Sequence, residues 1–144
     1  MSNKSKILVT IQFISFAVIL INTKAIAHGF WLLPQIIGFI IALLATFNLG
    51  IGNFNIQPEV KNQAFFKTQG MYQYVRNPIY LGLIIYFSAI IGNDFSVLSI
   101  IVLLILIVVL LLKINMEENF LTDRFKNDYI TYKNRTKRLL PFIY

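Results

Sequence analysis

Four long apolar segments constrain the fold of this chain more than any other feature of its sequence. A helix of about 20 residues crosses a hydrocarbon core of roughly 30 Å, and the segments 30–49 and 95–114 are that long. The segment beginning at residue 7 reaches this length if it continues to about residue 25. The segment 78–91 is shorter, because a proline precedes it and a turn signal follows at 92–94. The sequence therefore predicts transmembrane helices at about 7–25, 30–49, 78–91 and 95–114.

The fold class follows from where the polar residues lie. Hydrophobic residues make up 57% of the chain and charged residues 13%, and the charges cluster outside the apolar segments. A length of 144 residues suits one membrane-embedded domain, residues 1–144, without a separate soluble domain. We expect an all-α integral membrane protein of about four transmembrane helices. In an alternative with three transmembrane helices, the first apolar segment lies in the membrane interface.

Lysine and arginine residues predict the orientation of these helices. All of them except Lys24 precede the first helix, lie between the second and third, or follow from the end of the fourth. Positively charged loops stay on the cytoplasmic side of a membrane. Both termini and residues 50–76 should therefore be cytoplasmic, and residues 24–29 and 93–94 should face outward.

The sequence pattern changes after the fourth segment. Leu121, Phe125, Tyr129 and Tyr132 recur at spacings of four and three, which predicts an amphipathic cytoplasmic helix at about 116–135. This helix should lie on the membrane or cap the bundle. Basic residues near its end suit anionic headgroups, so membrane lipids are expected partners: Lys133, Arg135, Lys137 and Arg138.

The second helix carries a packing signal. Gly38 and Ala42 form a small-xxx-small pair on one face of it. Because small side chains let helix backbones approach, we expect a close contact with a neighbouring helix there.

Composition excludes several kinds of chemistry. The chain has no cysteine and one histidine, His28, so no thiolate, zinc or haem site is expected. The net charge of +7 is not arranged as a basic stripe with interleaved aromatics, so nucleic acid is not an expected partner. Any chemistry must come from carboxylates, amines, tyrosines and the backbone.

A helix-start motif precedes the third helix. In such a motif Asn77 accepts a hydrogen bond from a backbone N–H, and Pro78 occupies a position where no donor is needed. The N–H groups at this helix end would equally suit a ligand carboxylate.

Lys113 and Glu117 lie one helical turn apart at the end of the fourth helix, and Glu118 follows at once. Such a pair is by itself a weak structural salt bridge. Ionisable groups at membrane depth are costly, however, and tend to serve a function. The carboxylate could hold a cation and the lysine an anion.

Two motifs resemble those of a known enzyme family. Residues 70–82, Gly-Met-Tyr-Gln-Tyr-Val-Arg-Asn-Pro-Ile-Tyr-Leu-Gly, are similar to a motif of the isoprenylcysteine carboxyl methyltransferases and the related phospholipid methyltransferases. A second set of residues is similar to the C-terminal signature of that family: Glu117-Glu118, Leu121, Tyr129, Tyr132, Lys133 and the closing residues 140–143.

The resemblance implies a helical membrane methyltransferase that uses S-adenosylmethionine without a Rossmann domain. Its cofactor would bind near the cytoplasmic face, and a lipid-like acceptor would enter from the bilayer. Glu117 and Lys113 would be the catalytic residues, with Lys113 near the acceptor. The positions that match the cofactor site of the family are Gln57, Phe65, Phe66, Lys67, Tyr72, Asn77, Pro78, Ile79, Tyr80 and Glu117.

Two departures from the family pattern leave the acceptor open. Lys113 stands where the prenylcysteine enzymes carry an arginine, so a point charge replaces a bidentate fork, and Asn77 stands where they carry a histidine. The candidate acceptors are a prenylcysteine-type carboxylate, a phospholipid headgroup amine or another small lipophilic group. The alternatives from other classes are a non-catalytic membrane scaffold and a nicotinamide-dependent membrane reductase.

Overall fold

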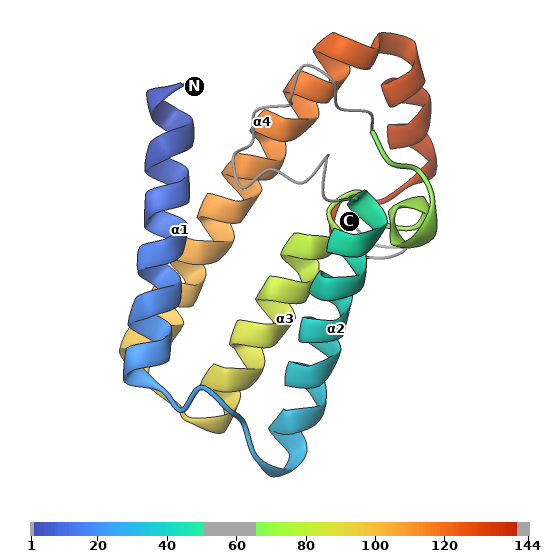
Figure 1. The fold of residues 1–144 in the computed structure, drawn as a ribbon. Helices are drawn as coiled ribbons and strands as arrows, with labels where there is room; N and C mark the ends of the chain where they lie inside the picture. The colour runs from blue at the N-terminus through green and yellow to red at the C-terminus, as the bar shows by residue number, and fades with distance from the viewer. Residues whose placement is uncertain (1, 51–65, 141–144) are drawn as a thin grey trace.

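The computed structural model describes residues 2–50 and 66–140. Within these ranges the chain forms four α-helices: α1 (Asn3–Asn22), α2 (Leu32–Leu49), α3 (Pro78–Asn93) and α4 (Val97–Arg135). Short 3-10 turns, η1 (Gly29–Trp31) and η2 (Gly70–Gln73), precede α2 and α3. Successive helices run in alternating directions (Figure 1). The predicted all-α architecture is confirmed.

Three of these helices are long and apolar enough to cross a membrane. They are α1 with 20 residues, α2 together with η1 with 21, and α4 with 39. The fourth, α3, is apolar but has only 16 residues, as its flanking proline and turn predict. Large apolar side chains such as Ile14, Phe39 and Leu104 are more than half exposed on the described surface. Water would penalise such a surface, whereas lipid tails would not.

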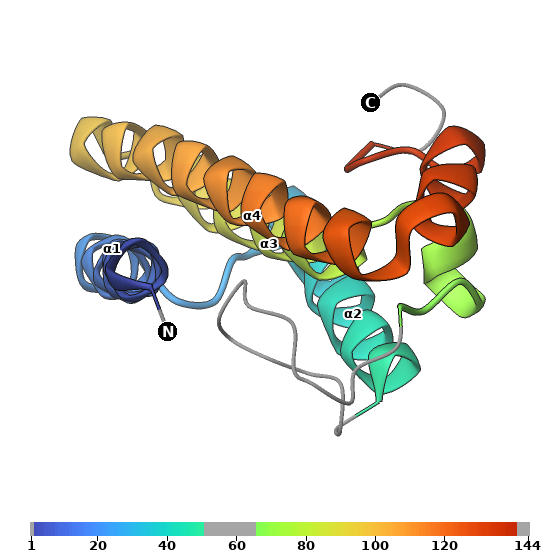
Figure 2. The same cartoon turned by 90° about the horizontal axis from the view of Figure 1, so that it is seen from above.

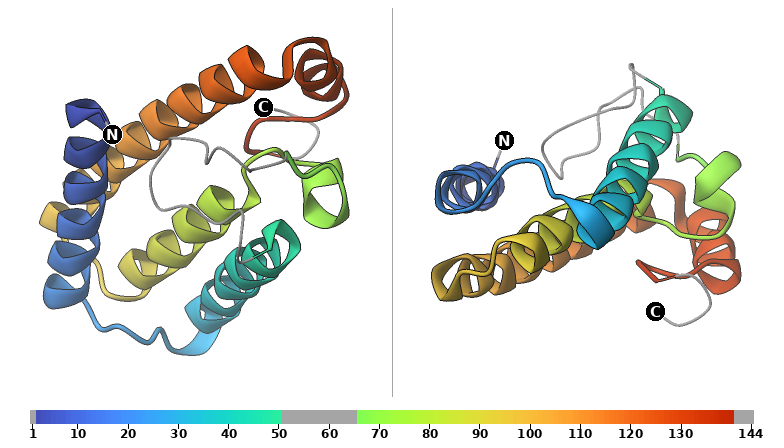
Figure 3. Two further views of the ribbon diagram at one scale, coloured as in Figure 1. Left: turned by 45° about the horizontal axis from the view of Figure 1, so that its top comes forward. Right: turned by 90° about the horizontal axis from the view of Figure 1, so that it is seen from below.

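The helices associate mainly as two pairs. One pair is α2 with α3 and the other is α1 with α4 (Figures 1 and 3). Figure 2 shows α1 and α2 well apart. The two pairs meet where α3 packs against α4 and where Phe16 of α1 stacks on Phe87 of α3, with ring centroids 4.7 Å apart. The common core is therefore formed by α3 together with α1 and α4.

Small residues bring α2 and α3 into close contact. A Cβ added at Gly82 would lie 2.6 Å from the Gly38 carbonyl oxygen and 2.6 Å from the Ala42 backbone nitrogen. A Cβ at Gly38 would lie 2.6 Å from the backbone nitrogen of Tyr86. The close contact predicted from Gly38 and Ala42 is confirmed, and the last glycine of the 70–82 motif is its counterpart on α3.

The link between α1 and α2 is fixed to the turn between α3 and α4. The Lys24 N–H donates to Asp94 Oδ2 at 3.0 Å, and the His28 N–H donates to Asn93 Oδ1 at 2.8 Å. Gln35 of α2 holds the same link through the Ala27 N–H at 2.8 Å. These bonds close the end of the bundle opposite the two motifs.

Several helix boundaries differ from the sequence predictions: α1 begins at Asn3 rather than near residue 7, and two further differences follow. Helix α1 ends at Asn22 rather than near residue 25, because Asn22 and Thr23 bond back to the carbonyls one turn earlier, at 2.8 and 2.7 Å. The break predicted near residue 115 is wrong, since α4 runs on and is interrupted at Lys126 (φ 47°, ψ −120°). Residues around 115 contain no helix-breaking glycine or proline, so the apolar and amphipathic parts join without a gap.

Candidate functional site

The two sequence motifs meet at one end of the bundle. Here η2 leads into α3, α4 leaves the apolar core, and the segment after Lys126 folds back toward the start of α3 (Figure 1). At about 1.5 Å per residue, the helix from Val97 to Glu117 rises roughly 30 Å, so a membrane span that begins at Val97 would end near Lys113 and Glu117. Polar side chains can therefore face both lipid and water at this end.

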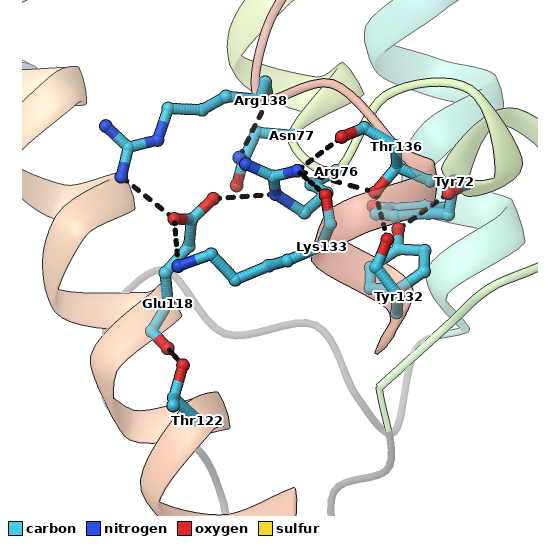
Figure 4. A network of polar contacts seen from close by, with 9 residues as sticks. All are labelled: Tyr72, Arg76, Asn77, Glu118, Thr122, Tyr132, Lys133, Thr136 and Arg138. Atoms are coloured by element: carbon cyan, nitrogen blue, oxygen red, sulfur yellow. Dashed lines mark hydrogen bonds and ion pairs between the residues drawn. The ribbon is translucent and has the colours of Figure 1, made fainter. Parts of the chain in front are cut away.

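Glu118 is the centre of a charged network at this end (Figure 4). Its side chain is 3% exposed and accepts from Arg76 Nε and from Arg138 Nη2, each at 2.8 Å. Lys133 Nζ lies 3.5 Å from the same carboxylate. Three cations from two separate segments thus converge on one buried anion of α4.

Arg76 also ties the returning C-terminal segment to the start of α3. Its Nη1 donates to the carbonyl oxygens of Thr136 at 2.6 Å and Lys133 at 3.0 Å (Figure 4). The Arg76 backbone N–H donates to the Lys137 carbonyl at 2.8 Å, and the Lys137 N–H donates to the Tyr74 carbonyl at 3.2 Å. These bonds form a short parallel bridge between the 70–82 motif and the C-terminal signature.

The predicted capping role of the Asn77 side chain is wrong. Asn77 does precede Pro78 at the start of α3, but its side chain makes no cap bond there. Its Nδ2 donates instead to the Arg138 carbonyl at 2.9 Å. The Arg138 carbonyl is within reach of the Asn77 amide because the Arg76 contacts bring the C-terminal segment alongside.

Tyr80, Lys113 and Glu117 form a second cluster, next to the Glu118 network. The Tyr80 hydroxyl donates to Glu117 Oε1, and the Lys113 ammonium lies over the Tyr80 ring, 5.4 Å from its centroid. Lys113 is 1% exposed, and its Nζ donates to Gln12 Oε1 of α1 at 2.6 Å. An anion, a cation and an aromatic ring from α3 and α4 therefore share one site.

Tyr72 lies near this cluster on η2. It is buried, and its backbone carbonyl accepts from the Tyr132 hydroxyl at 2.6 Å. Burial raises the pKa of the Tyr72 phenol, and the negative charge of Glu117 raises it further. Tyr72 therefore stays a neutral hydroxyl throughout the physiological pH range.

An aromatic cluster packs the segment after Lys126 against the chain before η2. The ring of Phe66 contacts those of Phe125, Tyr129 and Tyr132, with centroids 4.8, 5.5 and 5.6 Å apart. Tyr129 is fully buried there. The contacts explain why α4 is interrupted at Lys126, since a straight helix would carry Tyr129 and Tyr132 away from Phe66.

The structure brings together part of the predicted site. Tyr80 contacts both Lys113 and Glu117. The negative charge of Glu117 raises the pKa of the Tyr72 phenol, and Phe66 belongs to the aromatic cluster. Pro78 is buried at the start of α3, while Ile79 and Lys67 are half-buried. Gln57 and Phe65 lie outside the described residues.

Sequence reasoning missed the partners that hold this site. Gln12, a lone amide within an apolar run, was the detectable signal, because polar groups at membrane depth are costly. Lys133 and Arg138, which are expected to meet lipid headgroups, both lie against Glu118, a partner that the sequence did not indicate. Among the described residues, no group of histidine and acidic side chains is arranged to hold a metal.

Comparison with known proteins gives one match. The sequence model of a family described as phospholipid methyltransferase matches residues 25–128. This range contains α2, α3 and most of α4, including Tyr80, Lys113 and Glu117, and it begins after α1. A comparison with curated proteins finds no match.

Proposed function

This chain belongs to the phospholipid methyltransferase family, and from that premise we propose that it transfers a methyl group from S-adenosylmethionine to a phospholipid headgroup. The family makes it a membrane methyltransferase for lipid-like substrates; the donor, the acceptor and the residues that bind them are our proposal. One observation carries the assignment of the site. The Tyr80 hydroxyl donates to Glu117, so two motifs that are distant in sequence meet within the matched range.

The residues of this cluster suit the groups that the methyl donor carries. S-adenosylmethionine supplies a methyl group from a sulfonium, a displacement whose leaving group needs no acid. Glu117 would bind its ammonium group, as carboxylates form strong charge-assisted hydrogen bonds. The rings of Tyr72 and Tyr80 would flank its cationic or adenine parts. The backbone N–H groups at the start of α3, which the Asn77 side chain does not cap, would donate hydrogen bonds to its carboxylate.

Lys113 supports a phosphate-bearing acceptor. An ammonium is a compact point charge that can bind a phosphate from many directions, and the planar guanidinium fork that grips a carboxylate in bidentate fashion is absent at this position. Lys113 is buried beside the Tyr80 ring, where the acceptor headgroup would meet the methyl donor. The headgroup phosphate would lie at Lys113 and its amine nearer to the donor. A prenylcysteine carboxylate would instead favour arginine at this position.

The acceptor can be identified with labelled methyl donor. Purified protein is incubated with S-adenosylmethionine carrying a labelled methyl group and total membrane lipids, and the labelled products are separated. Label in phospholipid headgroups supports the proposal, whereas label in a prenylcysteine methyl ester alone would reassign the acceptor. Folded protein that binds neither S-adenosylmethionine nor its demethylated product at micromolar concentrations would point to the non-catalytic scaffold alternative.

Site variants separate a binding cluster from a structural one. Glu117→Gln should abolish donor binding, measured by calorimetry in detergent, and leave the protein folded. Tyr80→Phe should weaken binding by about tenfold, because one hydrogen bond to a charged group is lost. Asp123→Asn, an exposed carboxylate on the same helix, is the matched control and should change nothing. Equal effects of all three variants would refute the placement of the site.

A further inference from the structure

A hydrogen bond crosses from α1 to the candidate site. Gln12 is 6% exposed and its Oε1 accepts from Lys113 Nζ at 2.6 Å. The two residues are 101 positions apart, and α1 lies before the range that the family match covers. The contact therefore joins a residue outside the matched range, Gln12, to one inside it, Lys113.

The buried face of α1 is unusually polar for a membrane helix. Its buried residues are Ser5, Gln12, Ser15 and Ile19. Ser15 bonds within its own helix, to the Ile11 carbonyl at 2.8 Å. Gln12 instead reaches across to a charged group on α4. An amide at this depth is costly unless it is satisfied, and a carbonyl oxygen satisfies both itself and an ammonium.

The same bond restricts where the Lys113 ammonium can go. The ammonium of a lysine is carried on a flexible four-carbon stem, so a contact that fixes its position favours the binding of an anion there. Gln12 fixes the ammonium from one side, while the Tyr80 ring lies 5.4 Å away on another. Tyr80 in turn holds Glu117. The cation is thereby held beside the residues that we assign to the methyl donor.

We propose that Gln12 is a positioning residue, which orients Lys113 toward the anionic group of the acceptor and makes α1 part of the acceptor site. This inference rests on the proposed function, because it needs Lys113 to bind the acceptor. It assigns α1 a task beyond anchoring the chain. The residue acts through Lys113 and leaves the binding of the methyl donor unaffected.

The test compares three substitutions on the same helix. Gln12→Met keeps the size of the side chain and removes the acceptor oxygen; it should raise the acceptor KM by about ten- to a hundredfold. Its affinity for S-adenosylmethionine should equal that of the wild type. Gln12→Glu keeps an oxygen for Lys113 but adds a negative charge where the acceptor phosphate would bind, so it should not recover the loss. Ser15→Ala, a buried polar residue on the same face, is the control for packing and should leave KM unchanged.

A double-mutant cycle shows whether Gln12 acts through Lys113. In a Lys113→Met background, Gln12→Met should add no further rise in KM. Full additivity, or a KM in Gln12→Met equal to that in Ser15→Ala, would overturn the inference while the wild type still methylates lipid. A wild type that transfers label to no lipid would overturn the proposed function and this inference with it. If Gln12→Met fails to fold, Gln12→Asn, one methylene shorter than the native side chain, tests the same contact.

Discussion

Removing the charge of Glu118 should unfasten the C-terminal segment from the start of α3. The Glu118 carboxylate is 3% exposed and accepts bonds at 2.8 Å from Arg76 and Arg138. Each bond to a charged group contributes about 1.5–3 kcal/mol. Lys133, at 3.5 Å with a side chain 38% exposed, adds little after screening by water. Glu118→Ala should therefore lower the free energy of unfolding by about 3–5 kcal/mol, the cost typical of breaking a buried ion pair.

A glutamine at this position should have a smaller effect. Glu118→Gln keeps one carbonyl oxygen for an arginine but presents an amide group to the other, so we expect a loss of about 2–3 kcal/mol. The measurement is denaturant unfolding in detergent, followed by circular dichroism. Hydrogen exchange should rise first in residues 127–140, because Arg76 holds the Thr136 and Lys133 carbonyls there.

The control is an exposed carboxylate on the same helix. Asp123→Asn should change the unfolding free energy by less than about 0.5 kcal/mol. If Glu118→Gln and Asp123→Asn have equal effects, the network contributes nothing to stability and the reasoning fails. If Glu118→Gln lowers stability without raising exchange in residues 127–140, the network is stabilising but does not fasten that segment.

Four further predictions follow from other parts of the molecule. Gly82→Val should lower the thermal midpoint in detergent by overpacking α2 against α3, at a cost of about 1–3 kcal/mol; an unchanged midpoint would contradict the close contact. Lys126→Gly should raise the midpoint by relieving a positive φ, a gain of roughly 1 kcal/mol, and a lower midpoint would show that the conformation is not strained. A cysteine introduced at Gln63 should be labelled only from the cytoplasmic side, and labelling from outside intact cells would reverse the predicted orientation. Lys113→Arg should preserve or improve kcat/KM with a carboxylate acceptor and give no gain with a phospholipid; a gain confined to a prenylcysteine carboxylate would contradict the phospholipid assignment.

The helices were predictable because the hydropathy pattern and the helix-breaking and turn-forming residues agree along most of the chain. Pro78 fixes the start of α3, and the turn before Asp94 fixes its end, so this short helix was placed within two residues. The break at Lys126 was not predictable, since neither glycine nor proline stands there. Its position depends on contacts of Tyr129 and Tyr132 with Phe66, which lies far away in sequence. Local pattern carries no information about such contacts.

The candidate site was predictable only in part, for the same reason. The motifs contain Tyr80 and Glu117, and the family resemblance added Lys113, but the sequence gave no distance between these residues on α3 and α4. Gln12 could be recognised as a polar residue in an apolar run, but its partner lies 101 residues away. The sequence also could not show which of Glu117 and Glu118 has which partners. Adjacent residues on a helix point about 100° apart, but the side chains that each would meet were unknown.

The separation of the two glutamates explains how the site is built. Glu118 faces Arg76 and Arg138, whereas Glu117 faces Tyr80. Arg76 binds Glu118 on α4, Asn77 binds the Arg138 carbonyl of the returning segment, and Pro78 begins α3. Three successive residues of one motif therefore connect three separate parts of the chain. The position of Tyr80 relative to Glu117 is a consequence, because the first turn of α3 starts from this fixed point. The arginine, asparagine and proline of the motif position the start of α3, and Tyr80, in the first turn that follows, contacts Glu117 where we propose that the methyl donor binds.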